Sequence, residues 1–167
     1  MPKTYPKYLV SQEIEEGALA PMFEAISLFN GEFFLFSFKE MCKNNCLLIF
    51  SPYIFEPDVL ELIKKISNFM SKILNDESLI KKLAFVFIFT DSFHAIKEFL
   101  NEKESYCQNI YFISDFNLEI YTKFKLKNEF DFSKSIFLIN FCTMIVKKSL
   151  DIFEFDNLLN FFMLNTQ

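Results

Sequence analysis

The chain has 167 residues, of which 51% are hydrophobic and 23% charged, so it has the composition of a globular domain rather than of a disordered segment. Its formal net charge is -5 and all 17 basic residues are lysines, which argues against binding to a nucleic-acid backbone. Apolar runs such as 84–89 are far shorter than the ~20 residues of a membrane-spanning helix.

The amino-terminal residues 1–15 contain Pro2 and Pro6 and are interpreted as an arm that precedes a single domain at 16–167. They lack the long apolar stretch of a secretory signal, which predicts a cytoplasmic protein. Asn30-Gly31 then separates two apolar runs. Because a two-residue turn of this type needs positive φ angles, the dipeptide predicts a β-hairpin.

The segment CLLIFSPYIFEPDVLEL at 46–62 predicts a short strand, a turn around Pro52 and the beginning of a helix that runs from Pro57 to Leu74. Val59 begins an apolar series with the three-and-four spacing of a helix face that packs on a core. The series is Val59, Leu62, Ile63, Ile66, Phe69, Met70, Ile73 and Leu74.

The unbroken apolar run 84–90 predicts a strand buried on both faces. Asp91-Ser92 offers a capping start for a helix that ends near Glu102, and His94 is expected to lie in its first turn in contact with solvent.

In the last third of the chain, a strand is predicted at 110–113 and a helix from 116. The segments 134–140 and 144–148 predict a closing hairpin, and 153–164 predicts a final helix with Phe155, Leu158, Leu159 and Phe162 facing inward.

The alternation of strands and helices predicts an α/β sandwich. Because helix-bearing crossovers connect them, the strands at 46–50 and 84–90 are expected to be parallel neighbours.

Three segments carry a resemblance to a known family: Ala20-Pro21 followed by Phe23, the stretch TDSFHAIKEFL at 90–100, and Ser114-Asp115. They occur in the order seen in the peroxiredoxin family (alkyl hydroperoxide reductase C/thiol-specific antioxidant), which the chain resembles over roughly residues 16–150. The resemblance implies a thioredoxin-like sandwich, with a central mixed sheet flanked by helices and an amino-terminal hairpin.

The same resemblance implies a degenerate catalytic site. The family motif is Pro-x-x-x-Thr/Ser-x-x-Cys, whose cysteine attacks peroxide. Counted from Pro52, Glu56 stands at the Thr/Ser position and Val59 at the Cys position. If the motif is one residue shorter, the Cys position falls on Asp58. Lys134 stands where the family carries an activating Arg.

Two further departures concern the carboxyl-terminal half of the chain. Asn140 stands where the family carries an Asp. The cis-proline of thioredoxin-like oxidoreductases has no counterpart, because no proline follows Pro57.

The four cysteines are Cys42, Cys46, Cys107 and Cys142. None forms a C-x-x-C pair, and they are interpreted as structural thiols. His94 has no Cys or His at the spacing of a zinc ligand, so neither a metal nor a cofactor is predicted.

Two functions follow. The first is a peroxiredoxin-like protein that has lost peroxidase activity and acts as a binding or assembly module, as a homodimer or with another protein partner. The 25 phenylalanines exceed what a core of this size needs, and this excess favours an apolar interface. The alternative is a thiol peroxidase or disulfide oxidoreductase that uses a relocated cysteine, either Cys107 in the polar loop 105–109 or Cys142 at the tip of the closing hairpin.

Overall fold

The structure is a computed structural model that describes residues 14–41, 45–73, 83–102, 108–126, 135–140 and 145–149, together with residues 156, 157 and 160. Its strands are β1 (Glu24–Phe29), β2 (Glu32–Ser37), β3 (Asn45–Phe50), β4 (Leu83–Phe89), β5 (Tyr111–Ser114), β6 (Ser135–Ile139) and β7 (Ile145–Ser149). Its helices are α1 (Phe38–Met41), α2 (Pro57–Ile73), α4 (Phe93–Glu102) and α5 (Glu119–Lys123).

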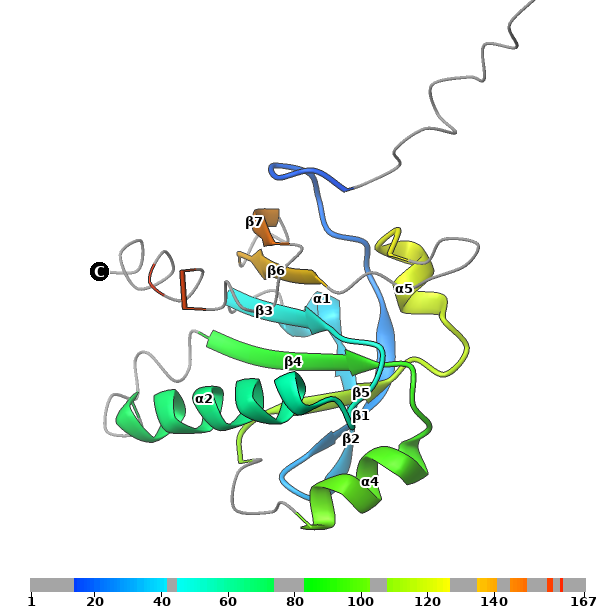
Figure 1. Ribbon diagram of the computed structural model, residues 1–167. Coiled ribbons are helices and arrows are strands. Elements are labelled where there is room, and N and C mark those ends of the chain that lie inside the picture. The colour runs from blue at the N-terminus through cyan, green and yellow to red at the C-terminus, as the bar shows by residue number, and fades with distance from the viewer. Residues whose placement is uncertain are drawn as a thin grey trace, which may run out of the picture.

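The strands form one seven-stranded mixed sheet in the order β2-β1-β5-β4-β3-β6-β7 (Figure 1). β3 and β4 are parallel neighbours, as predicted, and β4 and β5 are parallel too. The other four pairings, β1 with β2, β1 with β5, β3 with β6 and β6 with β7, are antiparallel. The sheet therefore has a parallel centre and an antiparallel hairpin at each edge.

The side chains of alternate residues in the central strands pack in two apolar layers, one on each face of the sheet. In β4, Phe85, Phe87 and Phe89 face the layer that contains the buried residues of α2 and α4. Ala84, Val86 and Ile88 face the opposite layer, which contains residues of α1 and α5. Because helices cover both faces of β4, all seven of its residues are buried, as its unbroken apolar sequence predicts.

The predicted amino-terminal hairpin is confirmed. β1 and β2 pair without a register shift around Asn30 and Gly31, whose φ angles are 50° and 82°. The closing hairpin is confirmed as β6 and β7. α4 begins after Ser92, whose Oγ accepts the Ala95 N–H at 3.3 Å.

The helix predicted from 116 begins three residues later, at Glu119. Residues 116–118 form a turn first, because Leu118 adopts a left-handed φ of 63° and donates its N–H to the Asp115 carbonyl at 2.9 Å. The short helix α1 was not predicted. In the predicted final helix, residues 156, 157 and 160 are helical, and its expected inward face lies outside the described residues. The division into an arm at 1–15 and a domain at 16–167 stays a prediction.

Candidate functional site

The loop 51–56 joins β3 to α2 across the carboxyl ends of β3 and β4. Its Pro52 carbonyl accepts both the Thr90 N–H at 2.8 Å and the Thr90 hydroxyl at 2.7 Å. The Ile54 N–H donates to Asp91 Oδ2 at 2.7 Å. Thr90 and Asp91 follow β4 directly, so three hydrogen bonds hold the loop against the end of the central strand.

Val59 lies in the first turn of α2, where its N–H donates to the Glu56 carbonyl at 3.1 Å. Its side chain is 0% exposed and packs in the apolar layer between α2 and the sheet. The prediction that Val59 is a packed residue at a helix start is confirmed. Glu56 and Asp58 are half-buried beside it, and Pro52 is buried.

Two carboxyl groups at this end of the sheet, Asp91 and Asp115, have raised pKa values. Burial raises the pKa of Asp91; the Ile54 N–H partly offsets the shift, and the charge of Glu56 adds to it. Burial also raises the pKa of Asp115, whose two oxygens accept the Ile120 and Tyr121 N–H groups at 3.0 and 2.8 Å. An added negative charge, such as a thiolate, is disfavoured near these groups.

Tyr121 bonds both to one of these carboxylates, Asp115, and to the central strand β4. Its hydroxyl donates to the Ile88 carbonyl of β4 at 2.7 Å. Burial raises the pKa of this phenol well above its usual value, and the charges of Asp115, Asp91 and Glu56 raise it further. Tyr121 is therefore a neutral structural donor at neutral pH.

Cys46 is the one thiol within the described ranges, and it is buried, as expected for a structural cysteine. It lies near the start of β3, at the opposite end of that strand from the loop 51–56. Burial raises the pKa of its thiol, which suppresses the nucleophilic thiolate. Cys42, Cys107 and Cys142 lie outside the described residues.

The two remaining positions predicted from the family motif flank β6. Lys134 lies outside the described residues and directly precedes Ser135, which pairs with Phe50 at the carboxyl end of β3. Asn140 follows β6 at its other end, where Ile139 pairs with Cys46. Asn140 therefore lies at the end of β6 that is remote from Phe50 and the loop 51–56.

His94 has the solvent exposure that the sequence predicts. Its side chain is 85% exposed, with Nε2 at 3.5 Å from Glu98 Oε1 one helical turn later. Within the part of the chain that the structure describes, no group of three metal-ligating side chains gathers.

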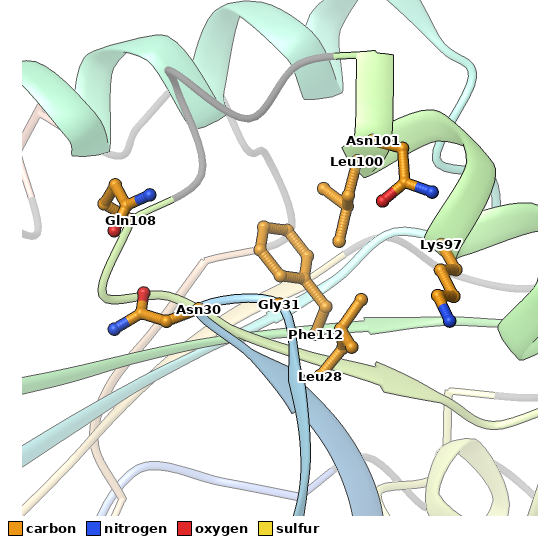
Figure 2. Close-up of a pocket in the computed structure, with 8 residues that line it drawn as sticks. All are labelled: Leu28, Asn30, Gly31, Lys97, Leu100, Asn101, Gln108 and Phe112. Carbon is orange, nitrogen blue, oxygen red and sulfur yellow. The ribbon is translucent and has the colours of Figure 1, made fainter.

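A cavity of about 290 Å³ lies at the opposite end of the sheet, and the sequence did not predict it. Figure 2 shows an apolar centre with polar side chains on both sides; the lining residues are Leu28, Asn30, Gly31, Lys97, Leu100, Asn101, Gln108 and Phe112.

Two turns are joined at the edge of this cavity. Asn30 Nδ2 donates to Asn109 Oδ1 at 3.2 Å, and the Asn109 N–H donates to Asn30 Oδ1 at 2.6 Å. The Asn30-Gly31 dipeptide is the sequence feature that marks this region, but it predicts only a turn and not a cavity.

Comparison with known proteins identifies the fold. No family model and no curated protein matches the sequence. Solved structures do match the fold, several of them with a probability of 1.00. The reduced 2-Cys peroxiredoxin of Plasmodium vivax is 15% identical, with a TM-score of 0.68 and coverage of 81% of this chain and 72% of that one. AhpC of Mycobacterium tuberculosis is 14% identical, with a TM-score of 0.69 and 84% of each chain covered.

Thioredoxin peroxidase I of Plasmodium yoelii is 19% identical, with a TM-score of 0.68 and 88% of each chain covered. The protein thus has a thioredoxin-like fold of the peroxiredoxin type, as its sequence predicts. At these identities the similarity concerns the fold and not the activity.

Proposed function

We propose that this protein has lost peroxidase activity and acts as a binding or assembly module that forms a homodimer in the cytoplasm. The observation that carries the proposal is the complete burial of Val59 in the first turn of α2, at the position where the family motif, counted from Pro52, has its reactive cysteine. Within the described residues, no helix is long and apolar enough to cross a membrane.

The chemical reason is that peroxide reduction needs a thiolate. Free N–H groups and the positive end of the helix dipole stabilise a thiolate in the first turn of a helix. Valine supplies no sulfur, and its side chain is completely buried in an apolar layer. Cys46 is no substitute, because it is buried and its pKa is raised.

The electrostatic surroundings support the same proposal. A peroxide-reducing site stabilises negative charge on sulfur. Here, burial and the neighbouring Glu56 raise the pKa of Asp91, which accepts the Ile54 N–H of the loop 51–56. A Lys at position 134 keeps a positive charge but lacks the planar fork with which Arg can hold two oxygens.

The direct test is the reaction of the full chain with hydrogen peroxide, followed by stopped-flow kinetics and by trapping of sulfenic acid. We expect slow consumption and no rapidly labelled cysteine. Fast labelling of Cys107 or Cys142, lost in the Cys107→Ser or Cys142→Ser variant, would overturn the proposal in favour of the relocated-cysteine enzyme.

Rebuilding the motif tests the position of the lost site. We expect Val59→Cys alone to react slowly with peroxide, because the new thiol would be buried and within about one helical turn of the Glu56 carboxylate. Adding Glu56→Thr and Lys134→Arg removes the repulsion and restores the bidentate donor. The triple variant should react about tenfold faster or more, since one pKa unit corresponds to a tenfold change.

The control for this series is the Glu56→Thr/Lys134→Arg double variant, which lacks the added cysteine and should remain as slow as the wild type. Equal rates for the single and triple variants would mean that the three positions do not form one site.

A further inference from the structure

The edge strand β2 exposes apolar side chains on both faces of the sheet. Phe33, Phe34 and Leu35 are 58%, 50% and 54% exposed, although they are consecutive residues of a strand. Phe33 and Leu35 point to the face that carries α4, because Phe33 is opposite Leu28 of that apolar layer. Phe34 points to the other face. Neither face of β2 is therefore a polar, water-facing surface.

The backbone of β2 also has an open edge. Since the turn has two residues, Phe29 and Glu32 form a hydrogen-bonded pair, and so do Ser27 and Phe34 two positions further on. Phe33 and Leu35 consequently direct their N–H and C=O groups away from β1. Among the described residues, β1 is the only strand that pairs with β2.

Natural edge strands are usually protected against pairing by lysine, proline or a β-bulge. β2 has none of these: its sequence EFFLFS lacks Lys and Pro, and its register with β1 is continuous. The combination of open backbone groups and three exposed apolar side chains is what strand addition requires.

We propose that β2 pairs antiparallel with β2 of a second copy of this chain, around a two-fold axis at Phe34. This inference specifies the interface of the homodimer in the proposed function. Phe33 of each copy then exchanges hydrogen bonds with Leu35 of the other, and the two Phe34 side chains face each other. The pairing joins two seven-stranded sheets into one.

The sequence of β2 favours a second copy as the occupant. The apolar triplet is symmetric about Phe34, so each exposed apolar side chain meets another in the antiparallel pair. The two Glu32 residues lie four positions apart along the seam, about 14 Å at the rise of a strand. That distance exceeds the Debye length of about 8 Å at physiological salt, so their repulsion is screened.

Helix α4 lies beside the proposed seam (Figure 1). The ring of Phe93 packs edge-on against Phe33 at 5.9 Å, and Lys97 Nζ lies 5.5 Å from the centre of the Phe33 ring. A two-fold axis perpendicular to the sheet keeps both α4 helices on the same side. The Phe33 and Leu35 side chains of both copies would thus be enclosed between two α4 helices.

The available area predicts a reversible dimer. With about half of each side chain exposed, the triplet offers roughly 100 Å² per residue, or about 600 Å² for two copies before the backbone is counted. Stable interfaces bury about 1,200–2,000 Å² in total. Association should therefore depend on protein concentration.

Sedimentation velocity over a wide concentration range tests the interface. We expect the wild type to shift from monomer to dimer as concentration rises. Leu35→Lys adds a charge to the seam, and Leu35→Pro removes the N–H that points away from β1; each should raise the dissociation constant about tenfold or more. Leu19→Lys is the control and should dimerise like the wild type; Leu19 is 71% exposed and follows Ala18, which bonds to Ile145 of β7 at the other edge of the sheet.

A crosslink tests the register independently of affinity. Phe34 faces itself as a non-hydrogen-bonded pair, with Cα atoms about 4.5 Å apart, a separation that a disulfide can span. Phe34→Cys oxidised with diamide should give a dimer linked through residue 34, identified by mass spectrometry. Glu32→Cys, four positions from its symmetry mate, is the control and should not crosslink.

The outcomes separate the inference from the proposed function. Dimers of Leu35→Lys and Leu35→Pro with wild-type affinity, or no linkage through residue 34, would overturn the β2 interface and leave the homodimer standing. A monomer at every concentration would overturn both the interface and the homodimer. Neither result concerns the loss of peroxidase activity, which the peroxide assay measures separately.

Discussion

Strands β4 and β2 have similar sequences and opposite surroundings. β4 is LAFVFIF and β2 is EFFLFS, so both are short, apolar and rich in phenylalanine. Every residue of β4 is buried, whereas the first four residues of β2 are exposed. The difference shows that position in the sheet, more than composition, decides what a phenylalanine contributes.

The cause lies in the neighbours of each strand. β4 pairs with β3 on one side and β5 on the other, and apolar layers cover both of its faces. β2 lies at the edge, with β1 as its partner in the described sheet. The same side chain should therefore stabilise the monomer in β4 and be available for association in β2.

The largest expected effect concerns the centre of β4. Phe87 is fully buried and stacks with Phe89 and Phe112, each with ring centroids 5.6 Å away. We expect Phe87→Ala to lower the free energy of unfolding by about 3–5 kcal/mol, since it leaves a cavity in a packed layer. Urea denaturation followed by circular dichroism measures the loss.

The matched change at the edge of the sheet is Phe33→Ala. It should lower the free energy of unfolding of the monomer by less than about 1 kcal/mol, because more than half of the side chain is already exposed. Equal losses at Phe87 and Phe33 would contradict the contrast between the two strands.

A smaller effect is expected at the turn that carries β2. Asn30 combines a φ of 50° with two hydrogen bonds to Asn109. Asn30→Ala loses both bonds and strains the left-handed turn, so we expect a loss of about 2 kcal/mol. Glycine adopts the left-handed conformation without strain. Asn30→Gly should therefore lower the free energy of unfolding by only about 1 kcal/mol, which is the contribution of the two hydrogen bonds.

Thermal unfolding at low protein concentration measures these two variants without interference from association. If Asn30→Gly were as damaging as Asn30→Ala, the positive φ would carry no cost and the turn would have to adopt another conformation.

The smallest expected effect is a pH dependence at the end of β4. Because burial raises the pKa of Asp91 in the folded state, the folded protein binds this proton more tightly than the unfolded chain does. The contribution of Asp91 to stability thus falls as pH rises through its folded pKa, and it recovers as pH falls toward about 4.

Thermal unfolding between pH 7 and pH 4 should show that the free energy of unfolding of the wild type rises relative to that of Asp91→Asn as pH falls. The expected difference is less than about 1 kcal/mol, because the carboxyl group is partly solvated. The exposed Phe33→Ala variant leaves every titratable group in place; it is the control, and its stability should change with pH as that of the wild type does. A wild type that instead loses stability relative to Asp91→Asn would mean that hydrogen bonding outweighs burial at this carboxyl group.

Local patterns predicted most of the elements. The Asn30-Gly31 dipeptide predicted the hairpin, the run 84–90 predicted a fully buried strand, and the apolar spacing after Pro57 predicted that Val59 packs inward. These features depend on neighbouring residues in the sequence. Ordinary periodicity and turn chemistry are therefore sufficient to recognise them.

Long-range features could not be predicted in the same way. No local pattern indicates that β1 pairs with β5 or that β2 ends at the edge, because both depend on how distant strands are ordered. The turn at 116–118 depends on the left-handed Leu118, an unusual conformation for a leucine. The three carboxylates around Tyr121 come together only in the folded chain.

The pairing of β1 with β5 has a consequence for the order of folding. The β1–β2 hairpin can form from neighbouring residues, but Phe29 meets Tyr111 only after the chain between them has been synthesised. At about 5–20 residues per second, the ribosome needs several seconds to add that length. During this interval β1 has β2 as a neighbour but lacks β5, so one backbone edge of the hairpin waits for a partner from the second half of the chain.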